Sequence, residues 1–297
     1  MDDFPIIDPH HHLWDLDKHY YPWLTDGPKP IVFGDYSPII KNYRIEDFLE
    51  DARNQNVVKS VHLDVGFDPR DPVGETRWLQ GVADAHGFPH GIVGYADLAS
   101  PGVRDVLEGH RAFPNFRGIR QSLNYHPDPV KTYLERPGLS REPDWRRGFG
   151  LLRDLDMSFD LQLYYSQMEE AYDLARAFPD TQIILNHTGM QVDGMDHFDA
   201  WKAGMHCLAA APNVACKISG LGMGDWTWTT DSIRPYVLEA IAAFGVDRCM
   251  FASNFPVDKL FSSYDRIFDA FKAITASFPT QDRRKLFHDN AERFYRL

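Results

Sequence analysis

Short runs of apolar and β-branched residues alternate along the chain with longer stretches in which apolar residues recur at helical spacing. Gly, Pro or Asn bounds the apolar runs, and each run has the length of a buried strand. Eight such runs occur, at residues 4–8, 57–65, 91–98, 116–121, 159–163, 182–186, 214–219 and 249–253. Eight stretches with helical spacing are interleaved with them, at 45–54, 75–85, 103–112, 145–155, 168–177, 198–210, 233–244 and 264–277. The pattern predicts an α/β protein built from eight strand–helix units.

Eight units of this kind match the number that closes a (β/α)8 barrel, the TIM barrel, because parallel strands need crossover connections. A doubly wound sheet also alternates strands and helices and stays open as an alternative. Segments 14–43 and 122–143 are rich in Pro and aromatic residues and lack helical periodicity. We expect them to be packed loops over one end of a barrel. No repeat, low-complexity tract or Gly/Ser linker occurs, so we predict a single domain, residues 1–297.

Charge and cysteine content narrow the classes of partner. Lys and Arg number 31 against 43 Asp and Glu, a net charge of −12 that repels nucleic-acid phosphates and anionic lipids. Three cysteines without close spacing form neither a disulfide framework nor a zinc motif, which suits a reducing cytoplasm. Acidic residues and histidines stand where a secretory signal has a basic region, and no long apolar run occurs. We expect a cytoplasmic protein with a small-molecule substrate, and the sequence does not reveal its oligomeric state.

Three consecutive histidines follow the first apolar run, in the order Asp8-Pro-His10-His11-His12. Alternate residues of an extended segment point the same way, so His10 and His12 share a face and His11 points away. Two imidazoles in that relation can chelate a divalent metal. A polar terminal segment without function is the competing interpretation. The apolar residues before the motif favour a buried strand with the histidines at its end.

Two further strand ends carry candidate groups. The sixth run ends in Asn186-His187, and in a barrel this end faces the same mouth as His10 and His12, so His187 is available as a third metal ligand. An ordinary loop histidine is the alternative. Lys217 is the single charge in the seventh run, where it either forms a salt bridge or polarises a substrate oxygen at the pocket floor.

The fourth and fifth runs add polar groups. Arg117 and Arg120 differ by an odd number, so on a regular strand only one enters the barrel mouth. Because the guanidinium fork matches a carboxylate or a lactone carbonyl, we expect Arg120, nearer the strand end, to contact substrate. Arg117 stays a second substrate-binding candidate, and ion pairing in the barrel wall is the alternative for both. Gln162 and Tyr164 share one face of the fifth run and are predicted to bind substrate.

Together these motifs resemble the amidohydrolase superfamily, specifically its "amidohydrolase 2" branch, which includes sugar lactonases and pyrone or muconolactone hydrolases. The resemblance runs from about residue 6 to residue 297 and rests on the motifs DPHHHLW, FRGIRQ, SFDLQL, ILNHTG, CKISGL, MFASNFPVD and FHDNAERFYRL, in this order. It implies a (β/α)8 barrel, hydrolysis of a lactone C–O bond, and a pocket formed by the matching residues at the strand ends.

One position departs from the family pattern. In that branch the last strand typically ends in an Asp that binds metal and serves as general base, whereas here residues 252–256 read ASNFP. Asn254 neither takes a proton nor supplies negative charge. Three neutral histidines, His10, His12 and His187, still resemble a catalytic zinc site. A bound divalent ion, zinc by preference, and metal-independent catalysis both stay open.

Lactone hydrolysis needs a base for the attacking water and positive groups for the developing oxyanion. Arg120, Lys217 and the histidines are the positive groups at hand, and Asn254 belongs to the same predicted catalytic set. With an ordinary histidine pKa of about 6.5, His187 is the first candidate base. Asp258 is the alternative carboxylate. Trp226, in a loop with Trp228, can stack on a sugar ring or on an aromatic acid.

Two other functions remain as alternatives. A metal-dependent decarboxylase of aromatic carboxylic acids uses the same barrel with similar histidine motifs, and a firmly bound metal with an apolar ring pocket would favour it. A degenerate barrel that binds ligand without turnover is the other alternative, since Asn254 replaces the family Asp. The joint presence of His10, His12, His187, Arg120 and Lys217 argues against such decay.

Overall fold

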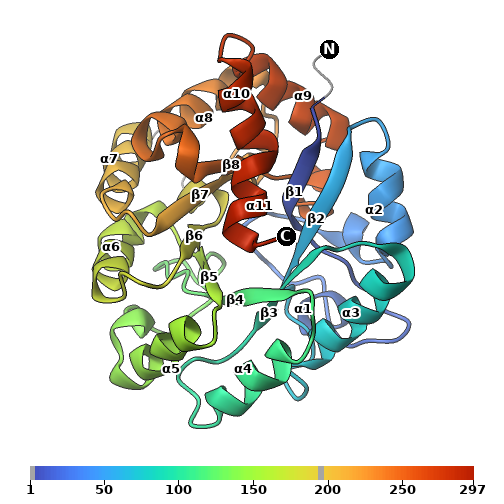
Figure 1. Ribbon diagram of the computed structural model, residues 1–297, viewed down its shortest axis with the longest axis vertical. Helices are drawn as coiled ribbons and strands as arrows, with labels where there is room; N and C mark the ends of the chain where they lie inside the picture. The colour runs from blue at the N-terminus through green and yellow to red at the C-terminus, as the bar shows by residue number, and fades with distance from the viewer. Residues whose placement is uncertain (1–3, 193–196) are drawn as a thin grey trace.

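The protein is built around eight parallel strands that follow one another in sequence order around a nearly closed barrel (Figure 1). The computed structural model describes residues 4–192 and 197–297. The strands are β1 (Ile6–His11), β2 (Val57–Leu63), β3 (Gly91–Tyr95), β4 (Phe116–Ser122), β5 (Ser158–Gln162), β6 (Ile183–Leu185), β7 (Val214–Ile218) and β8 (Cys249–Phe251). Each strand pairs in parallel with the next. The predicted (β/α)8 barrel is confirmed.

Helices form a ring outside the strands (Figure 1). A helix of this ring follows each strand, in order α2 (Ile45–Ala52), α3 (Gly74–His86), α4 (Val103–Arg111), α5 (Pro143–Asp154), α6 (Met168–Ala177), α7 (Phe198–Ala209), α8 (Thr230–Phe244) and α9 (Tyr264–Ile274). α9 shows why they form: the Ser263 side chain caps its first turn by accepting the Arg266 N–H, and apolar residues at helical spacing face inward. Among the described residues, no helix is both long and apolar enough to cross a membrane.

The first strand is longer than the sequence predicted. It was expected at 4–8 with the histidines beyond its end, but β1 runs from Ile6 to His11. Pairing with β2, where His11 is the register partner of His62, keeps the histidine segment extended. His11 points outward and stacks on Phe48 of α2, with ring centroids 4.1 Å apart. Tertiary pairing therefore extends the strand past the point where the apolar pattern ends.

The two segments expected as packed loops contain only short helical turns. Segment 14–43 holds α1 (Pro22–Thr25) and η1 (Ser37–Ile39), and its side chains Trp14, Tyr21 and Tyr36 are buried. Segment 122–143 holds η2 (Leu139–Arg141). Both segments contribute walls to the cavity described below. The expectation of packed loops at the barrel end is confirmed.

The barrel interior is closed at the end where the strands begin. There α10 (Thr280–Arg284), the π-turn η9 (Lys285–Asp289) and α11 (Asn290–Tyr295) follow the last crossover helix, and α11 crosses the middle of the barrel in Figure 1. Apolar side chains of α11 and of the inner strand faces form one buried cluster, made of Ile7, Val61, Leu63, Val93, Ile184, Ala215, Met250, Ala291, Phe294 and Tyr295. α11 therefore seals the barrel floor.

A carboxylate joins the first strand to the last. Asp8 accepts the N–H of His10 at 3.3 Å and of Ser253 at 3.0 Å, and the hydroxyl of Tyr264 at 2.9 Å. The Asp8 side chain is fully buried, and burial raises its pKa to about 6. Backbone bonds from His12 N to Phe255 O at 2.7 Å and from Asn254 N to His10 O at 2.8 Å complete the junction. These contacts fix both strand ends that carry candidate site residues.

The cysteines lie on the side of the molecule formed by the last strands. Cys216 of β7 and Cys249 of β8 are register partners and are buried, whereas Cys207 on α7 is partly exposed. All three are free thiols.

We predict that Tyr295→Phe lowers the free energy of unfolding by about 1–3 kcal/mol, because the Tyr295 hydroxyl donates to Asp160 Oδ1 at 2.7 Å inside the barrel. Urea unfolding followed by circular dichroism measures this change. Tyr20→Phe is the control, since its hydroxyl bond to Asp26 is exposed and its loss should change stability by less than about 0.5 kcal/mol. Equal effects of the two substitutions would contradict a role for the buried bond.

Candidate active site

A cavity of about 400 Å³ opens at the end of the barrel where the strands finish. Strand ends and the long loops build its walls together. It is lined by His12, Trp23, Ile31, Phe33, Asp64, Val65, Gly66, Tyr95, Arg120, Gln121, Ser122, Tyr133, Leu134, Gln162, His187, Met190, Met223, Asn254 and Val257. Five residues predicted for the site, namely His12, Arg120, Gln162, His187 and Asn254, line it.

Three predicted histidines gather at this cavity. The ring centroid of His10 lies 5.0 Å from that of His12 and 4.4 Å from that of His187. His12 and His187 line the cavity, and His10 lies between them, fully buried. The structure thus places His10 beside both His12 and His187, and their shared role as metal ligands stays a prediction.

The free nitrogen atoms of these histidines suit a divalent cation. His12 Nδ1 donates to the carbonyl of Leu63 at 2.8 Å, and His187 Nδ1 is hydrogen-bonded to Ser219 Oγ at 2.9 Å. Outer contacts of this kind fix ring orientation in metal-binding histidines and leave Nε2 as the ligand atom. Within the described parts of the chain, neither ring nitrogen of the buried His10 has a hydrogen-bond partner. The donor chemistry of the three rings fits an ion of the zinc class, but their ligand atoms do not all lie within 4.8 Å of one another, so sharing one ion requires the rings to move closer together.

Burial controls the charge of this cluster. It lowers the pKa of His10, His12 and His187 well below the usual histidine value, with neighbouring Lys217 and Arg120 contributing. The expectation of an ordinary pKa of about 6.5 for His187 is therefore wrong. The three rings are neutral at pH 7, the form in which imidazole binds metal and accepts a proton.

A left-handed turn directs His187 into the cavity. Ile184 faces the barrel interior, so continued strand alternation would turn His187 away from it. Instead His187 and Thr188 have φ values of 54° and 50°, a backbone conformation that non-glycine residues rarely adopt. A Cβ at Gly220 would lie 2.6 Å from His187 Nδ1, so this glycine leaves the space that the ring occupies.

Arg120 is held by two partners in the cavity wall. Its guanidinium donates to Gln162 Oε1 at 2.8 Å and to the Asp64 carbonyl, and its Nε lies 3.5 Å from Asp64 Oδ2. Asp64 also accepts the Gly66 N–H at 3.1 Å. Burial raises the pKa of Asp64, and the Arg120 charge opposes that shift. The described lining contains no further Lys or Arg, so Asp64 compensates its one permanent positive charge.

Lys217 does not line the cavity. Its Nζ lies 2.5 Å from Asp160 Oδ1 and 3.4 Å from the Pro9 carbonyl, and its side chain is fully buried. Burial lowers the pKa of Lys217 to about 8, although Asp160 opposes the shift. The structure thus shows the salt bridge that the sequence allowed, with Asp160 as partner. A direct contact between Lys217 and substrate at the pocket floor is not supported by this placement.

Asn254 and Asp258 form a buried pair. Asn254 Nδ2 donates to Asp258 Oδ2 at 2.5 Å, and the Asn254 backbone is left-handed with φ 58°. Asn254 lines the cavity, whereas Asp258 lies behind it. Burial raises the pKa of Asp258 to about 7. Asp258 is thus linked to the cavity through Asn254 and does not itself line it, and the predicted contact of Asp258 with substrate stays a prediction.

Three other predicted substrate contacts lie away from the cavity. Arg117 lines a separate depression with Arg111 and Arg296, because its odd separation from Arg120 turns it outward. The Tyr164 hydroxyl donates to the Lys131 carbonyl and so braces the loop that carries Tyr133. Trp226 is 56% exposed and stacks near Phe261. Arg117, Tyr164 and Trp226 are therefore not among the residues that line this cavity, and their contact with substrate stays a prediction.

Several residues in or beside the cavity were missed from the sequence, and of these Asn186 does not line it. Asp64 is the lone carboxylate near the end of the second apolar run. A single charge within an apolar run is the same signal that made Lys217 a candidate. Asn186 carries two buried side-chain atoms without hydrogen-bond partners, although it lies beside His187 in the sequence. Trp23 and Tyr133 come from the long loops, where no periodicity indicates which ring faces inward.

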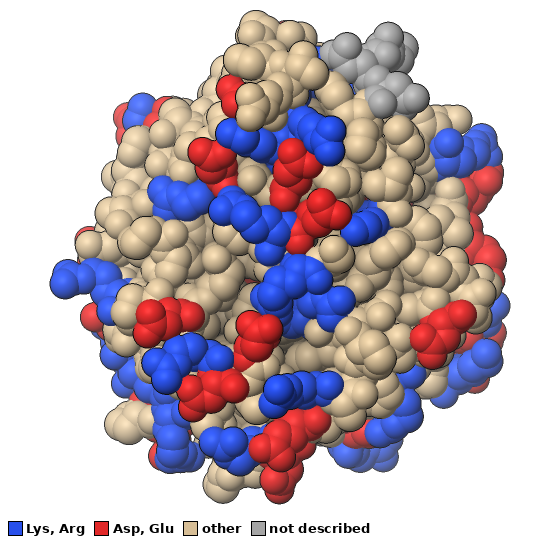
Figure 2. Space-filling model, in the orientation of Figure 1, with Lys and Arg blue, Asp and Glu red and all other residues tan. Residues whose placement is uncertain are grey.

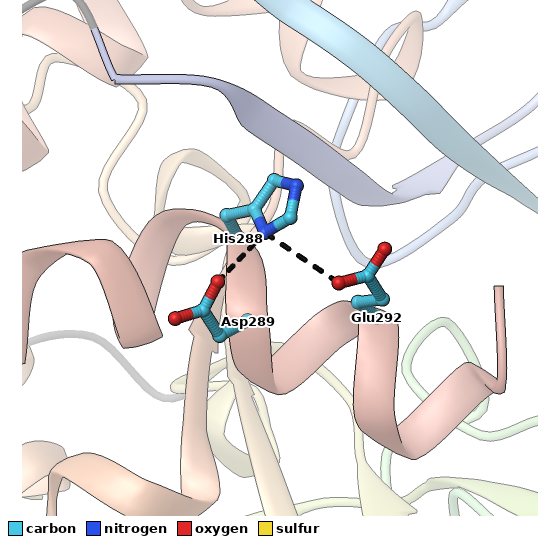
Figure 3. Close-up of side chains that lie close together, drawn as sticks. All are labelled: His288, Asp289 and Glu292. Carbon is cyan, nitrogen blue, oxygen red and sulfur yellow. Dashed lines mark hydrogen bonds and ion pairs between the residues drawn. The ribbon is translucent and has the colours of Figure 1, made fainter.

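A second group of metal-type side chains lies near the opposite end of the barrel. Within residues 4–192 and 197–297, His288, Asp289 and Glu292 are the grouping whose ligand atoms all fall within 4.8 Å (Figure 3). Lys59 Nζ lies 2.8 Å from Glu292, and Arg284 lies 3.1 Å from Asp289. Figure 2 shows basic and acidic side chains interspersed on this face. The group therefore forms part of a surface ion-pair network.

Comparisons with known proteins place the chain in a family and agree with the barrel fold. A family model described as amidohydrolase matches residues 7–297. The chain is 68% identical to the protein y4mH of Sinorhizobium fredii over all of both chains. It is 28% identical to an L-fucono-1,5-lactonase of Burkholderia ambifaria, covering 98% of this chain and 95% of that one. A crystal structure of an amidohydrolase from Burkholderia multivorans with bound zinc superimposes with a TM-score of 0.83 at 24% identity, covering 99% and 100% of the chains.

We predict that Lys217→Met lowers the free energy of unfolding by about 3–5 kcal/mol, because it leaves Asp160 charged and buried. The double variant Lys217→Met/Asp160→Asn should recover a large part of that loss. Denaturant unfolding of the four proteins gives the coupling energy. If the two substitutions were simply additive, the ion pair would not be the main role of Lys217.

We predict that Asn254→Asp raises zinc content only slightly, because the new carboxyl contacts Asp258 and the two share a proton. Asn254→Asp/Asp258→Asn places a single carboxylate at the cavity and should raise zinc affinity about tenfold or more. Elemental analysis after dialysis against zinc at fixed free concentration measures both. Asp258→Asn alone is the control. The assumed geometry would be refuted if the double variant held no more zinc than the parent.

Proposed function

We propose that this chain, which belongs to the amidohydrolase family, hydrolyses the ester bond of a small neutral lactone. The observation that carries the proposal is the neutral histidine cluster of His10, His12 and His187 at a cavity with one charge-compensated arginine. The 28% identity to an L-fucono-1,5-lactonase over nearly the whole chain supports the same reaction class.

Charge in the cavity favours a substrate without carboxylates. Arg120 faces Asp64 at 3.5 Å, and His12 and His187 are neutral because burial lowers their pKa values. The net charge of the lining is therefore close to zero, so a dianionic substrate gains little attraction. Aromatic rings from Trp23, Phe33, Tyr95 and Tyr133 offer flat apolar faces. Such faces suit the C–H side of a sugar-like lactone ring.

The proposed reaction needs one proton acceptor and one oxyanion donor. His187 Nε2 takes the proton of water as its oxygen attacks the lactone carbonyl carbon. Arg120 donates to the carbonyl oxygen as that oxygen gains negative charge. The ring C–O bond then breaks, and the proton held by His187 passes to the leaving oxygen. The product is a hydroxy acid, and Ser219 keeps the His187 ring oriented throughout.

His10, His12 and His187 would hold a divalent cation of the zinc class, which when bound polarises a carbonyl oxygen and acidifies water. His12 and His187 face the cavity with Nδ1 already bonded. His10, which is buried beside both rings, would supply a third neutral ring nitrogen as ligand. With a cation in place, the proton acceptor has to be a group that the cation does not occupy, and Asp258, linked to the cavity through Asn254, is a candidate.

A decarboxylase of aromatic acids is a second candidate, favoured by the apolar and aromatic cavity walls. It differs from the lactonase in needing recognition of a carboxylate, and the compensated charge of Arg120 argues against that. Incubation with hydroxybenzoic acids and measurement of released CO₂ separates the two. Release of CO₂ without any lactone opening would replace our proposal.

We predict that His187→Asn lowers kcat for neutral sugar 1,5-lactones by about 100-fold to 10,000-fold, the range for loss of a general base. A pH-indicator assay of proton release measures the rate on protein of matched metal content. Because burial lowers the pKa of His187, the acidic limb of the parent's kcat profile should lie below the ordinary value of about 6.5. Full activity of the variant with an unchanged acidic limb would assign the base elsewhere, with Asp258 next to test.

We predict that Arg120→Lys lowers kcat and raises KM, because lysine keeps the charge facing Asp64 but loses the fork that reaches Gln162. The loss in kcat/KM should be about 10-fold to 1,000-fold, as for removal of an oxyanion donor. Arg117→Lys is the matched control and should leave both constants unchanged, since Arg117 lies outside the cavity. Equal losses in both variants would indicate a structural effect.

A further inference from the structure

A second cavity adjoins the first and contains an unused acid. Its volume is about 290 Å³, and it shares Trp23, Asp64, Gly66 and Tyr95 with the candidate active site. The rest of its lining is Pro22, Phe67, Asp68, Pro69, Pro72 and Glu75. None of the proposed reaction steps uses this space or Glu75.

Glu75 lacks a partner that its charge would require. Its side chain is 2% exposed, and it accepts a hydrogen bond from the Val65 backbone N–H. In residues 4–192 and 197–297, its Oε1 atom has no hydrogen-bond partner. Asp68 is paired with Arg70 at 2.6 Å, and Asp64 with Arg120 at 3.5 Å. Glu75 has no such cation among the described residues. An unpaired carboxyl at this depth is costly unless it is protonated or a ligand supplies the positive charge.

The lining selects for ligands that donate hydrogen bonds. Three carboxyl groups, from Asp64, Asp68 and Glu75, surround the space, and no lysine, arginine or histidine lines its described walls. The indole N–H of Trp23 donates to the Val65 carbonyl at 2.7 Å, so only the ring face of Trp23 is available to a ligand. Acceptors combined with aromatic faces are the arrangement that binds organic ammonium ions.

We propose that this second cavity binds an alkylammonium group, with Glu75 as its counter-ion and Trp23, Phe67 and Tyr95 as aromatic walls. A sugar ring would fit the volume, but sugar hydroxyls also need donors, which the side chains here do not provide beyond the hydroxyl of Tyr95. The inference does not depend on lactone hydrolysis. The ammonium group belongs either to the molecule in the active-site cavity or to a separate ligand.

Binding should change the protonation of Glu75. Burial and the negative charge of Asp64 raise the Glu75 pKa well above its usual value, and Arg120 acts in the opposite direction. The other titratable groups that face it are Tyr21, whose buried hydroxyl is also without a partner, Tyr95 and Asp68. A cation beside Glu75 favours its charged form, so the complex should release up to one proton at pH 7.

The test compares choline with 3,3-dimethylbutan-1-ol, which has the same shape without the charge. Calorimetry on the full chain should show choline binding about tenfold or more tightly than the alcohol. Glu75→Gln, an isosteric change, should weaken choline binding by about tenfold. It should also abolish the proton release seen when the titration is repeated in buffers of different ionisation enthalpy.

Two matched variants control for structural effects. Asp68→Asn removes a carboxylate that Arg70 already compensates, so choline affinity should change less than about threefold. Phe67→Leu keeps an apolar wall but removes a ring face and should weaken choline more than the alcohol. Thermal melts verify that each variant is folded. Equal binding of the two probes, or unchanged choline affinity in Glu75→Gln, would overturn the proposal.

A competition experiment shows whether the ammonium group belongs to the substrate in the active-site cavity or to a separate ligand. Choline is titrated with and without a neutral sugar δ-lactam, a non-hydrolysable lactone analogue. Mutual exclusion means that one substrate spans both cavities, and independent binding means a separate ligand. Failure of lactone hydrolysis would leave the choline result intact, so the two proposals fail separately.

Discussion

Closure of the barrel between its first and last strands is the constraint on which the site depends. β8 has only three residues, and it reaches β1 through the Asp8 carboxylate and two backbone bonds beyond the strand end. Those same bonds fix His10, His12 and Asn254, because all three lie within a few residues of the junction. A displacement of β8 by even one residue would separate the histidines from the cavity wall. Fold and site geometry are therefore set by one set of contacts.

Pairs of opposite or hydrogen-bonding groups are the second feature of the barrel interior. Lys217 is paired with Asp160, Arg120 with Asp64, and Asn254 with Asp258. Burial keeps the histidines neutral, and the pairing of Arg120 with Asp64 leaves the cavity lining without net charge. Within the part of the chain that the structure describes, Glu75, His10 and Asn186 instead have buried side-chain atoms without hydrogen-bond partners. A buried polar group without a partner indicates a place where a ligand could supply the missing hydrogen bond.

The sequence predicted the barrel, its eight strands and the three histidines, because strand alternation and strand ends are local properties. It failed for contacts that depend on distant elements. Lys217 was placed on the correct strand and Asp258 in the loop after the last strand, but their partners, Asp160 and Asn254, hold both side chains out of the cavity lining. The loop rings Trp23 and Trp226 look alike in sequence, and only packing of the loops distinguishes the cavity wall from the surface. The pKa of His187 depends on burial, which no motif reveals.

The positions of the three thiols give the molecule an internal reporter. Cys207 is partly exposed on α7, while Cys216 and Cys249 are sealed between the last two strands and their covering helices, and burial raises the Cys216 pKa well above its usual value. A maleimide dye would therefore modify one site in the native protein. The remaining two become reactive only while that part of the wall is open. The rate of the slow labelling phase therefore measures how often β7 and β8, the strand pair that ends at the active site, open transiently.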